Sequence, residues 1–139
     1  KAALEYGEKS GATFVHPYNN PDIIAGQGTV GLEIFDQLDN IDVVLVPIGG
    51  GGLISGIAIA LKQLNPSIKI IGVEPEDAQS MKMSIEANEP RMLTSCNTIA
   101  DGIAVKSPGD LTFEITRNLV DNSFRCRNCS NYLYAIAEG

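Results

Sequence analysis

Residues 43–56 have the sequence VVLVPIGGGGLISG, in which a short β-branched run is followed by four consecutive glycines and an apolar segment. A continuously apolar run of this length is typical of a parallel strand buried on both faces, and residues 53–64 have the apolar pattern of a helix. Glycines between a strand and a helix adopt positive φ freely and, lacking a Cβ, let an anion approach their N–H groups. The positive end of the helix dipole adds to this attraction, so the pattern predicts a phosphate-binding turn at residues 49–52. A plain glycine-rich turn is the alternative, although such a turn rarely needs so many glycines in succession.

Two common phosphate-binding motifs do not match this turn. The P-loop requires a lysine after its last glycine, and none follows here, so ATP hydrolysis is not indicated. The dinucleotide fingerprint G-x-G-x-x-G comes closer, because Gly50, Gly52 and Ser55 miss it by one residue. Glu74 also lies about 20 residues further on, where that motif places an acidic residue. A dinucleotide-binding module therefore stays open as an alternative.

The composition is that of one globular domain that handles a small molecule. The 139 residues are 44% hydrophobic, and ten Lys plus Arg against 17 Asp plus Glu give a net charge of −7. We therefore expect no nucleic acid and no anionic membrane as partner. No apolar segment approaches the roughly 20 residues of a membrane span, and no signal-like segment opens the sequence. Three cysteines, an odd number, agree with a reducing compartment, so we expect a cytoplasmic protein.

The order of the expected elements predicts an α/β fold. Helices are expected over residues 1–9, 29–38, 53–64, 80–88 and 111–120, and strands over residues 13–15, 43–48 and 68–73. This alternation indicates three layers built on a mainly parallel, doubly wound sheet. In such sheets, ligands bind beyond the carboxyl ends of the strands, where the glycine run lies.

Five motifs, in order along the chain, carry a resemblance to a known family. They are Val15-His16-Pro17, Ile24-Ala25-Gly26-Gln27-Gly28-Thr29, the run from Val46 to Gly56, Gly72-Val73-Glu74-Pro75 and Thr98-Ile99-Ala100-Asp101-Gly102. Together they make residues 1–121 resemble the pyridoxal-phosphate enzymes of the tryptophan synthase β type (fold type II), specifically the serine/threonine dehydratase and serine racemase family. The resemblance implies that residues 1–121 are part of the large, cofactor-binding domain.

The resemblance also implies an activity. The family suggests an ammonia-lyase of amino-acid metabolism, as in isoleucine biosynthesis, that converts the amino acids L-threonine or L-serine to a 2-oxo acid and ammonia. A serine racemase-like enzyme is an alternative, as is a non-catalytic module that binds phosphate or a dinucleotide. The choice between threonine and serine, and between dehydration and racemisation, stays open, and the parent protein is expected to be a homo-oligomer.

The cofactor that the family implies is pyridoxal 5'-phosphate. The residues that match its phosphate-binding loop are Gly49, Gly50, Gly51, Gly52 and Leu53. Gly102 matches a glycine that packs against one face of the pyridine ring, where any Cβ would obstruct the cofactor. A single phosphate needs converging N–H groups and a helix dipole, but neither the lysine nor the ribose contact of the two other motifs.

A mono- or divalent cation site is also implied beside the active site. Glu74, Ala78 and Ser80 match this site through a carboxylate, a backbone carbonyl and a hydroxyl oxygen. Members that bind a divalent metal often have Asp where Ser80 stands, so the missing charge should weaken Mg²⁺ or Ca²⁺ binding. A solvated glutamate at the end of a strand is the alternative for Glu74.

The chain lacks the family's catalytic motif. The lysine that forms the Schiff base lies in a Ser-x-Lys-x-Arg-like motif, which is absent here, so no catalytic residue is expected. His16, the only histidine, has no nucleophile pattern near it and is not expected to act as a base. The chain therefore resembles a central fragment. Residues 122–139 diverge from the family where a strand and an acidic helix are expected, and a reading-frame disruption or cloning artefact is one hypothesis for this tail.

Overall fold

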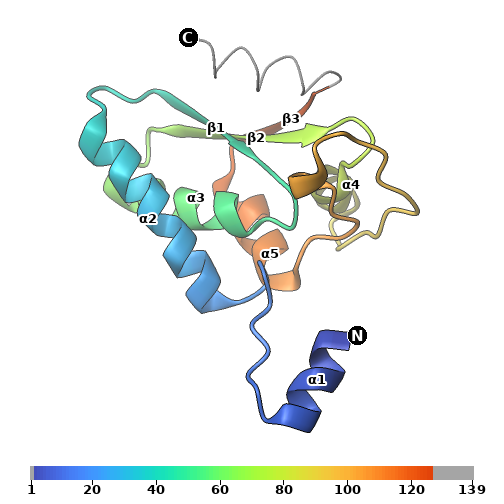
Figure 1. Ribbon diagram of the computed structural model, residues 1–139. Helices are drawn as coiled ribbons and strands as arrows, with labels where there is room; N and C mark the ends of the chain where they lie inside the picture. Colours follow the sequence, from blue (N-terminus) through green and yellow to red (C-terminus); the bar gives the residue numbers. More distant parts are fainter. Residues whose placement is uncertain (1, 127–139) are drawn as a thin grey trace.

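The computed structural model describes residues 2–126, which alternate between helices and parallel strands (Figure 1). In chain order the elements are α1 (Ala2–Ser10), α2 (Pro21–Gln37), β1 (Val43–Pro47), α3 (Gly52–Leu64), β2 (Lys69–Pro75), α4 (Ser80–Ala87), the short 3-10 helix η1 (Asp101–Ile103), α5 (Asp110–Leu119) and β3 (Asn122–Cys126). No helix in this part of the chain is long and apolar enough to cross a membrane.

The three strands form one parallel sheet in the order β1-β2-β3. Val43 pairs with Lys69, and Ile71 pairs with Asn122, so the carboxyl ends of all three strands lie at the same edge. The α3 helix connects β1 to β2, whereas α4, η1 and α5 connect β2 to β3. The α/β fold with a parallel sheet is therefore confirmed.

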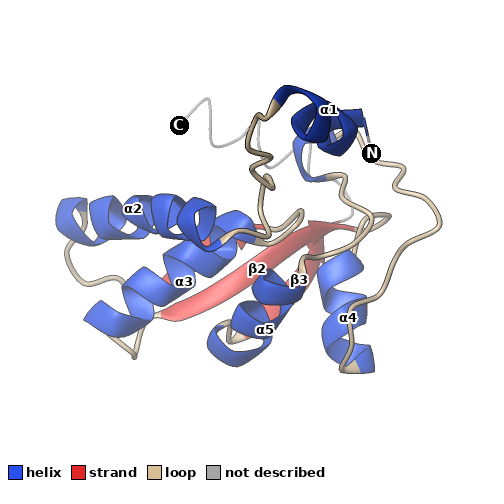
Figure 2. Ribbon diagram, turned by 90° about the horizontal axis from the view of Figure 1, so that it is seen from below, coloured by secondary structure: helices blue, strands red, loops and turns tan. Residues whose placement is uncertain are grey.

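Helices α2 to α5 all lie on one side of the sheet, with α2 outside α3 (Figures 1 and 2). The core between these layers includes Ile48, Ile54, Leu61, Ile68, Ile70 and Met81. Along β1, Val46 is 2% exposed, but Leu45 on the other face is 65% exposed. The prediction that this strand is buried on both faces is therefore wrong for residues 2–126, because no described helix covers its second face. These residues supply the sheet and one helical layer.

The α2 helix begins at Pro21, well before the predicted start at Thr29. Asn20 caps it, since its Oδ1 accepts hydrogen bonds from the N–H groups of Asp22 at 2.8 Å and Ile23 at 3.1 Å. Pro21 occupies the first turn, where a missing N–H is harmless and the fixed φ suits a helix. The cap residue and the proline after it are both sequence signals of a helix start at Pro21.

The glycines inside α2 and α3 allow the two helices to pack closely. A Cβ on Gly28 would lie 3.3 Å from the carbonyl oxygen of Gly56, and a Cβ on Gly56 would overlap the carbonyl oxygen of Ile24. The predicted strand at residues 13–15 is wrong, since this segment forms no strand and pairs with no other segment of the described chain. A strand needs a neighbour to satisfy its backbone groups, and the sequence alone gave no sign that one was missing.

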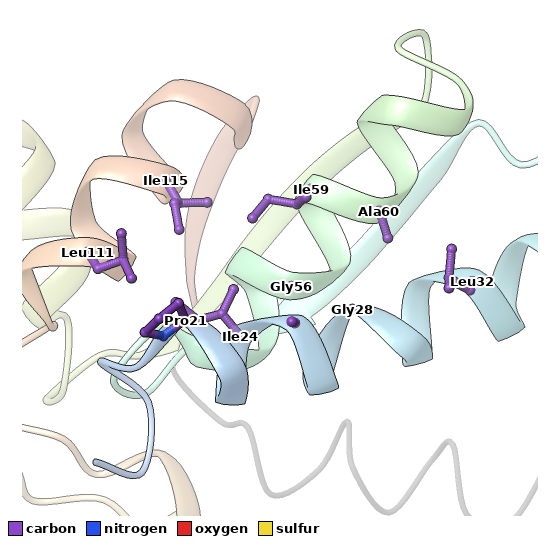
Figure 3. A pocket seen from close by; sticks show the side chains of 10 residues that line it. Pro21, Ile24, Gly28, Leu32, Gly56, Ile59, Ala60, Leu111 and Ile115 are labelled. Atoms are coloured by element: carbon purple, nitrogen blue, oxygen red, sulfur yellow. The ribbon is translucent and has the colours of Figure 1, made fainter. Parts of the chain in front are cut away.

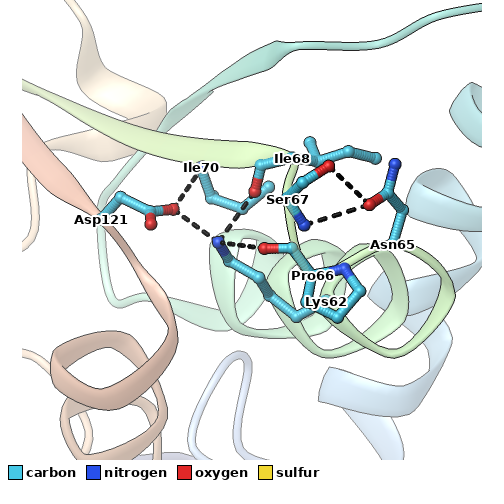
Figure 4. Close-up of polar contacts among 7 residues, drawn as sticks. All are labelled: Lys62, Asn65, Pro66, Ser67, Ile68, Ile70 and Asp121. Atoms are coloured by element: carbon cyan, nitrogen blue, oxygen red, sulfur yellow. Dashed lines mark hydrogen bonds and ion pairs between the residues drawn. The ribbon is translucent and has the colours of Figure 1, made fainter.

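The end of α3, the start of β2 and the residue before β3 are joined by polar contacts at the amino end of the sheet (Figure 4). Lys62 Nζ donates to Asp121 Oδ2 at 2.7 Å and to the carbonyl oxygen of Ile68 at 2.8 Å. The same Asp121 oxygen accepts the N–H of Ile70 at 2.8 Å. At the start of the divergent tail, Asn122–Cys126 forms β3, in the place where the family resemblance expects a strand. The remainder of the divergent tail lies outside the described residues.

Candidate functional site

The glycine turn lies at the carboxyl edge of the sheet, between β1 and α3. Gly51 has φ 95° and is the N-cap residue of α3. This left-handed conformation suits glycine because a Cβ would approach the following carbonyl group. Gly50, Gly51 and Gly52 are buried, while Gly49 and Leu53 are half-buried.

The N–H groups of this turn have no protein acceptor. Within residues 2–126, no oxygen accepts a hydrogen bond from the N–H of Gly49, Gly50, Gly51, Gly52 or Leu53. The first turn of α3 contains no acidic side chain, and its N-cap glycine offers no side-chain oxygen. Buried N–H groups without acceptors are costly, and those at a helix N-terminus attract anions. The turn therefore fits a phosphate group.

Other segments of the protein wall in the turn on several sides. A Cβ on Gly50 would overlap the ring of Tyr18, whose hydroxyl donates to the carbonyl oxygen of Ser107 at 3.1 Å. A Cβ on Gly49 would lie 3.1 Å from Cα of Ile103. Close packing therefore requires glycine at positions 49 and 50 whether or not a ligand is bound. No local pattern pointed to Tyr18, because Ser107 and Gly50, its contacts at the turn, lie far away along the chain.

Gly102 lies in η1, next to the glycine turn. A Cβ added there would meet no atom within 4 Å, so the space beside Gly102 is open. Its neighbour Ile103 contacts Gly49, which brings η1 and the turn together although they are far apart in sequence. Open space beside a glycine is what a packed aromatic ring requires. The predicted role of Gly102 stays a prediction that this geometry fits.

Glu74 is buried at the end of β2 and is 1% exposed, so the alternative of a solvated glutamate is wrong. Its Oε1 accepts the N–H of Met81 and its Oε2 accepts the N–H of Lys82, each at 2.9 Å. Burial raises the pKa of Glu74 to about 7, although these two bonds and the Lys82 charge act in the opposite direction. The carboxyl group therefore caps α4, a role that the sequence did not indicate.

Ala78 and Ser80, the other predicted cation ligands, are also buried. The hydroxyl oxygen of Ser80 has no hydrogen-bond partner in the described part of the chain. Residues 2–126 contain no group of three or more His, Cys, Asp or Glu side chains arranged to hold a metal ion. A cation at this place would be held by one carboxylate, that of Glu74, and by neutral oxygens.

His16, Lys82 and Lys106 have partners outside the glycine turn. His16 Nδ1 accepts the N–H of Asn19 at 2.9 Å, and its ring packs edge-on against Tyr18 with centroids 4.6 Å apart. Lys82 Nζ lies 4.0 Å from Glu86 Oε1, and Lys106 Nζ donates to the carbonyl oxygen of Thr94 at 3.1 Å. Among the described residues, no lysine hydrogen-bonds to the glycine turn.

A separate apolar groove lies between α2, α3 and α5 (Figure 3). Its volume is about 340 Å³, and it is lined by Pro21, Ile24, Ala25, Gly28, Leu32, Gly56, Ile59, Ala60, Leu111 and Ile115. None of these side chains carries a charge or a hydroxyl group. The groove therefore offers no side-chain donor to a phosphate, which leaves the glycine turn as the candidate site.

The chain belongs to the pyridoxal-phosphate dependent enzyme family, whose model matches residues 1–130. It is 54% identical over 121 residues to the L-threonine ammonia-lyase of Thermotoga maritima, which covers 87% of this chain and 30% of that protein. The catabolic L-threonine dehydratase of Escherichia coli K12 is 50% identical over 118 residues, or 85% of this chain and 36% of that protein. The chain thus spans about a third of the length of these curated relatives.

Solved structures agree with this membership. The processed form of threonine deaminase isoform 2 from Solanum lycopersicum superposes with a TM-score of 0.89 at 44% identity, covering 91% of this chain and 37% of that one. Maize serine racemase gives a TM-score of 0.86 at 44% identity, covering 91% of this chain and 40% of that one. The fold is therefore fold type II of the pyridoxal-phosphate enzymes.

Proposed function

We propose that this chain is the phosphate-binding part of a pyridoxal-phosphate-dependent ammonia-lyase that acts on L-threonine or L-serine. The observation that carries the proposal is the row of N–H groups at residues 49–53, at the N-terminus of α3, which have no acceptor within residues 2–126. Threonine ammonia-lyases and dehydratases at 50% identity or more support the reaction. Serine racemase stays the alternative, supported by the maize structure.

The described residues would hold and orient the cofactor. Bound pyridoxal phosphate supplies an electron sink for charge that develops on the substrate. The N–H groups of residues 49–53 would donate to the phosphate, and burial strengthens such bonds because water is excluded. Gly102 would leave room for the ring. The cofactor's Schiff-base lysine and the proton transfers are assigned to no residue of this chain.

The proposal extends to the whole protein. It includes an amino-acid substrate, a homo-oligomer and a cytoplasmic location, none of which depends on the geometry of the turn. It also keeps residues 1–121 as a partial large domain and residues 122–139 as a divergent tail, which begins with β3.

Titration with inorganic phosphate, followed by amide NMR, tests the phosphate site directly. We expect the amide signals of Gly49 to Leu53 to shift, and pyridoxal phosphate to compete for the same residues. NAD⁺ should leave these signals unchanged. Shifts confined to other residues, or shifts with NAD⁺ and none with pyridoxal phosphate, would overturn the proposal. In the protein that contains this chain, release of a 2-oxo acid from L-threonine distinguishes dehydration from racemisation.

We also propose a cation site at Glu74, Ala78 and Ser80, for which the unpartnered Ser80 hydroxyl is the specific support. One carboxylate with neutral oxygens suits a monovalent ion better than a divalent one. At pH 8, KCl should raise the Tm of the chain more than MgCl2 or choline chloride of equal ionic strength. Ser80→Asp should reverse the order of K⁺ and Mg²⁺. Equal effects of K⁺ and choline would contradict the site.

A further inference from the structure

The carbonyl group of Gly50 is held by the N-terminus of α5. Thr112 Oγ1 donates to the Gly50 oxygen at 2.6 Å, and the Gly109 N–H lies 3.4 Å from the same oxygen. Thr112 is 0% exposed, and its hydroxyl also accepts the Gly109 N–H at 3.1 Å. This contact joins residues 62 positions apart in the chain. The carbonyl is therefore fixed by a buried side chain rather than by solvent.

The orientation of this carbonyl determines the direction of a neighbouring donor. In a planar trans peptide, the C=O of one residue and the N–H of the next point in opposite directions. Thr112 thus directs the Gly51 N–H away from α5. No acceptor for this N–H exists among the described residues. A peptide between two glycines rotates more easily than others, because both residues tolerate positive φ. Without a restraint, a flip would present the Gly50 carbonyl oxygen, which repels an anion.

We propose that Thr112 is a positioning residue for the phosphate site, which holds the Gly50–Gly51 peptide so that the Gly51 N–H points at the bound phosphate. The inference rests on the proposed function, because it assumes that an anion occupies the turn. Ser55 supports Thr112 from the side of α3, since its Oγ donates to the Thr112 carbonyl at 3.5 Å. The contact thus joins α3, the turn and α5 around a single peptide group.

A purely structural role for Thr112 predicts different results. Thr112 is the third residue of α5, where its hydroxyl could act only as a cap for Gly109. Asn19 provides a matched control, because its Oδ1 accepts the N–H of Leu111 at 3.0 Å and caps the same helix, but Asn19 makes no hydrogen bond to Gly50. If capping is all that matters, Thr112→Val and Asn19→Ala will have the same effect on phosphate binding.

The experiment measures binding of inorganic phosphate to the chain and to three variants. Thr112→Val, which keeps the shape but loses the hydroxyl, should weaken binding about tenfold or more, as expected for a lost bond to a charged group. Thr112→Ser should bind within about threefold of the unmodified chain. Asn19→Ala should lose stability but keep its phosphate affinity. Unchanged affinity in a folded Thr112→Val variant, or equal weakening in Asn19→Ala, would overturn the inference.

If Thr112→Val does not fold, amide NMR of the unmodified chain still tests the inference. On addition of phosphate, the Gly51 amide should shift together with those of Gly49 and Leu53. If Gly49 and Leu53 shift while Gly51 does not, the role of Thr112 is wrong and the proposed function stands. If none of the three shifts, the phosphate site itself is wrong, and the inference fails with it.

Discussion

The glycines of the turn have different surroundings, although Gly50 and Gly52 both face Tyr18, so substitutions there should differ in cost. Gly50 faces the Tyr18 ring, Gly49 faces Ile103, and Gly51 combines φ 95° with close packing. A Cβ on Gly51 would lie 2.7 Å from Cε of Met81. Backbone strain and steric overlap therefore coincide only at Gly51.

Gly51→Ala should lower the free energy of unfolding by about 2 kcal/mol or more, since the left-handed conformation alone costs an L-residue about 1–2 kcal/mol. Gly26→Ala is the control, because Gly26 is exposed on α2 and a Cβ there would meet no atom within 4 Å. That change should stabilise the helix by about 0.5–1 kcal/mol. Urea denaturation followed by circular dichroism measures both, and a similar loss in the two variants would contradict the argument.

The raised pKa of Glu74 should make stability depend on pH. Burial is the main cause, and it raises the pKa from 4.5 to about 7 on folding. Between these values the folded state binds more protons than the unfolded state, so the free energy of unfolding falls as pH rises. Each pH unit of this interval corresponds to about 1.4 kcal/mol, which gives a total loss of about 3 kcal/mol by pH 8.

Glu74→Gln removes this titration and should flatten the pH dependence of stability between pH 5 and 8. The variant should gain stability relative to the unmodified chain as the pH rises. Glu86→Gln, on the exposed side of α4, is the control and should retain the original slope. Denaturant unfolding at several pH values in choline buffers measures the effect, and identical slopes for all three proteins would show that Glu74 is not responsible.

The β2 strand has one face covered by helices and one face that the described residues leave open. Ile70 is fully buried under the helices, whereas Ile71 points to the opposite face and is half-buried. Because the two residues are chemically identical, they form a matched pair. Ile70→Ala should lower the free energy of unfolding by about 2–5 kcal/mol, and Ile71→Ala by less than half of that. Equal losses would mean that another layer covers the second face.

The positions of helices and strands were predicted from the sequence better than the contacts between them. The strand predicted at residues 43–48 and the helix predicted at residues 53–64 agree with β1 and α3. Both predictions used continuous apolar runs and neighbouring glycine and proline residues, which are local features of the sequence. The strand at residues 13–15 failed because β-branched and aromatic residues indicate only the tendency to pair. The start of α2 failed because glycines needed for packing against α3 resembled helix breakers.

At the candidate site, too, local patterns were recognised and contacts between distant residues were not. The glycine turn was predicted from a local pattern, and Gly102 and Glu74 followed from the family resemblance. Tyr18 and Thr112 were missed, since their contacts with the turn join residues far apart in sequence. A threonine at the third position of α5 suggests a capped helix, but no local pattern identifies Gly50 as its second partner.

The Lys62 contacts join α3 to the starts of β2 and β3, and so connect the helical layer to the sheet. Lys62 is 15% exposed and Asp121 is 40% exposed, so the ion pair is partly screened by water. Partial burial acts to raise the pKa of Asp121, but the hydrogen bonds from Lys62 and Ile70 outweigh it and hold the pKa below its ordinary value. The contribution of the pair to stability is therefore present above the usual pKa of 3.8 and is lost as pH falls below it.

Lys62→Met keeps the apolar stem of the side chain but removes its three donors, which leaves the carbonyl oxygen of Ile68 without this partner. Since the pair is partly exposed, we expect a loss of about 1 kcal/mol in the free energy of unfolding at pH 7. Lys69→Met is the control, because Lys69 has no side-chain partner in the described part of the chain. The Ile70 N–H donates to Asp121 Oδ2. Its hydrogen-exchange rate should therefore rise in Lys62→Met and stay unchanged in Lys69→Met. If the Ile70 N–H exchanges equally in both variants, the start of β3 is held by backbone pairing, and Lys62 contributes nothing to its position.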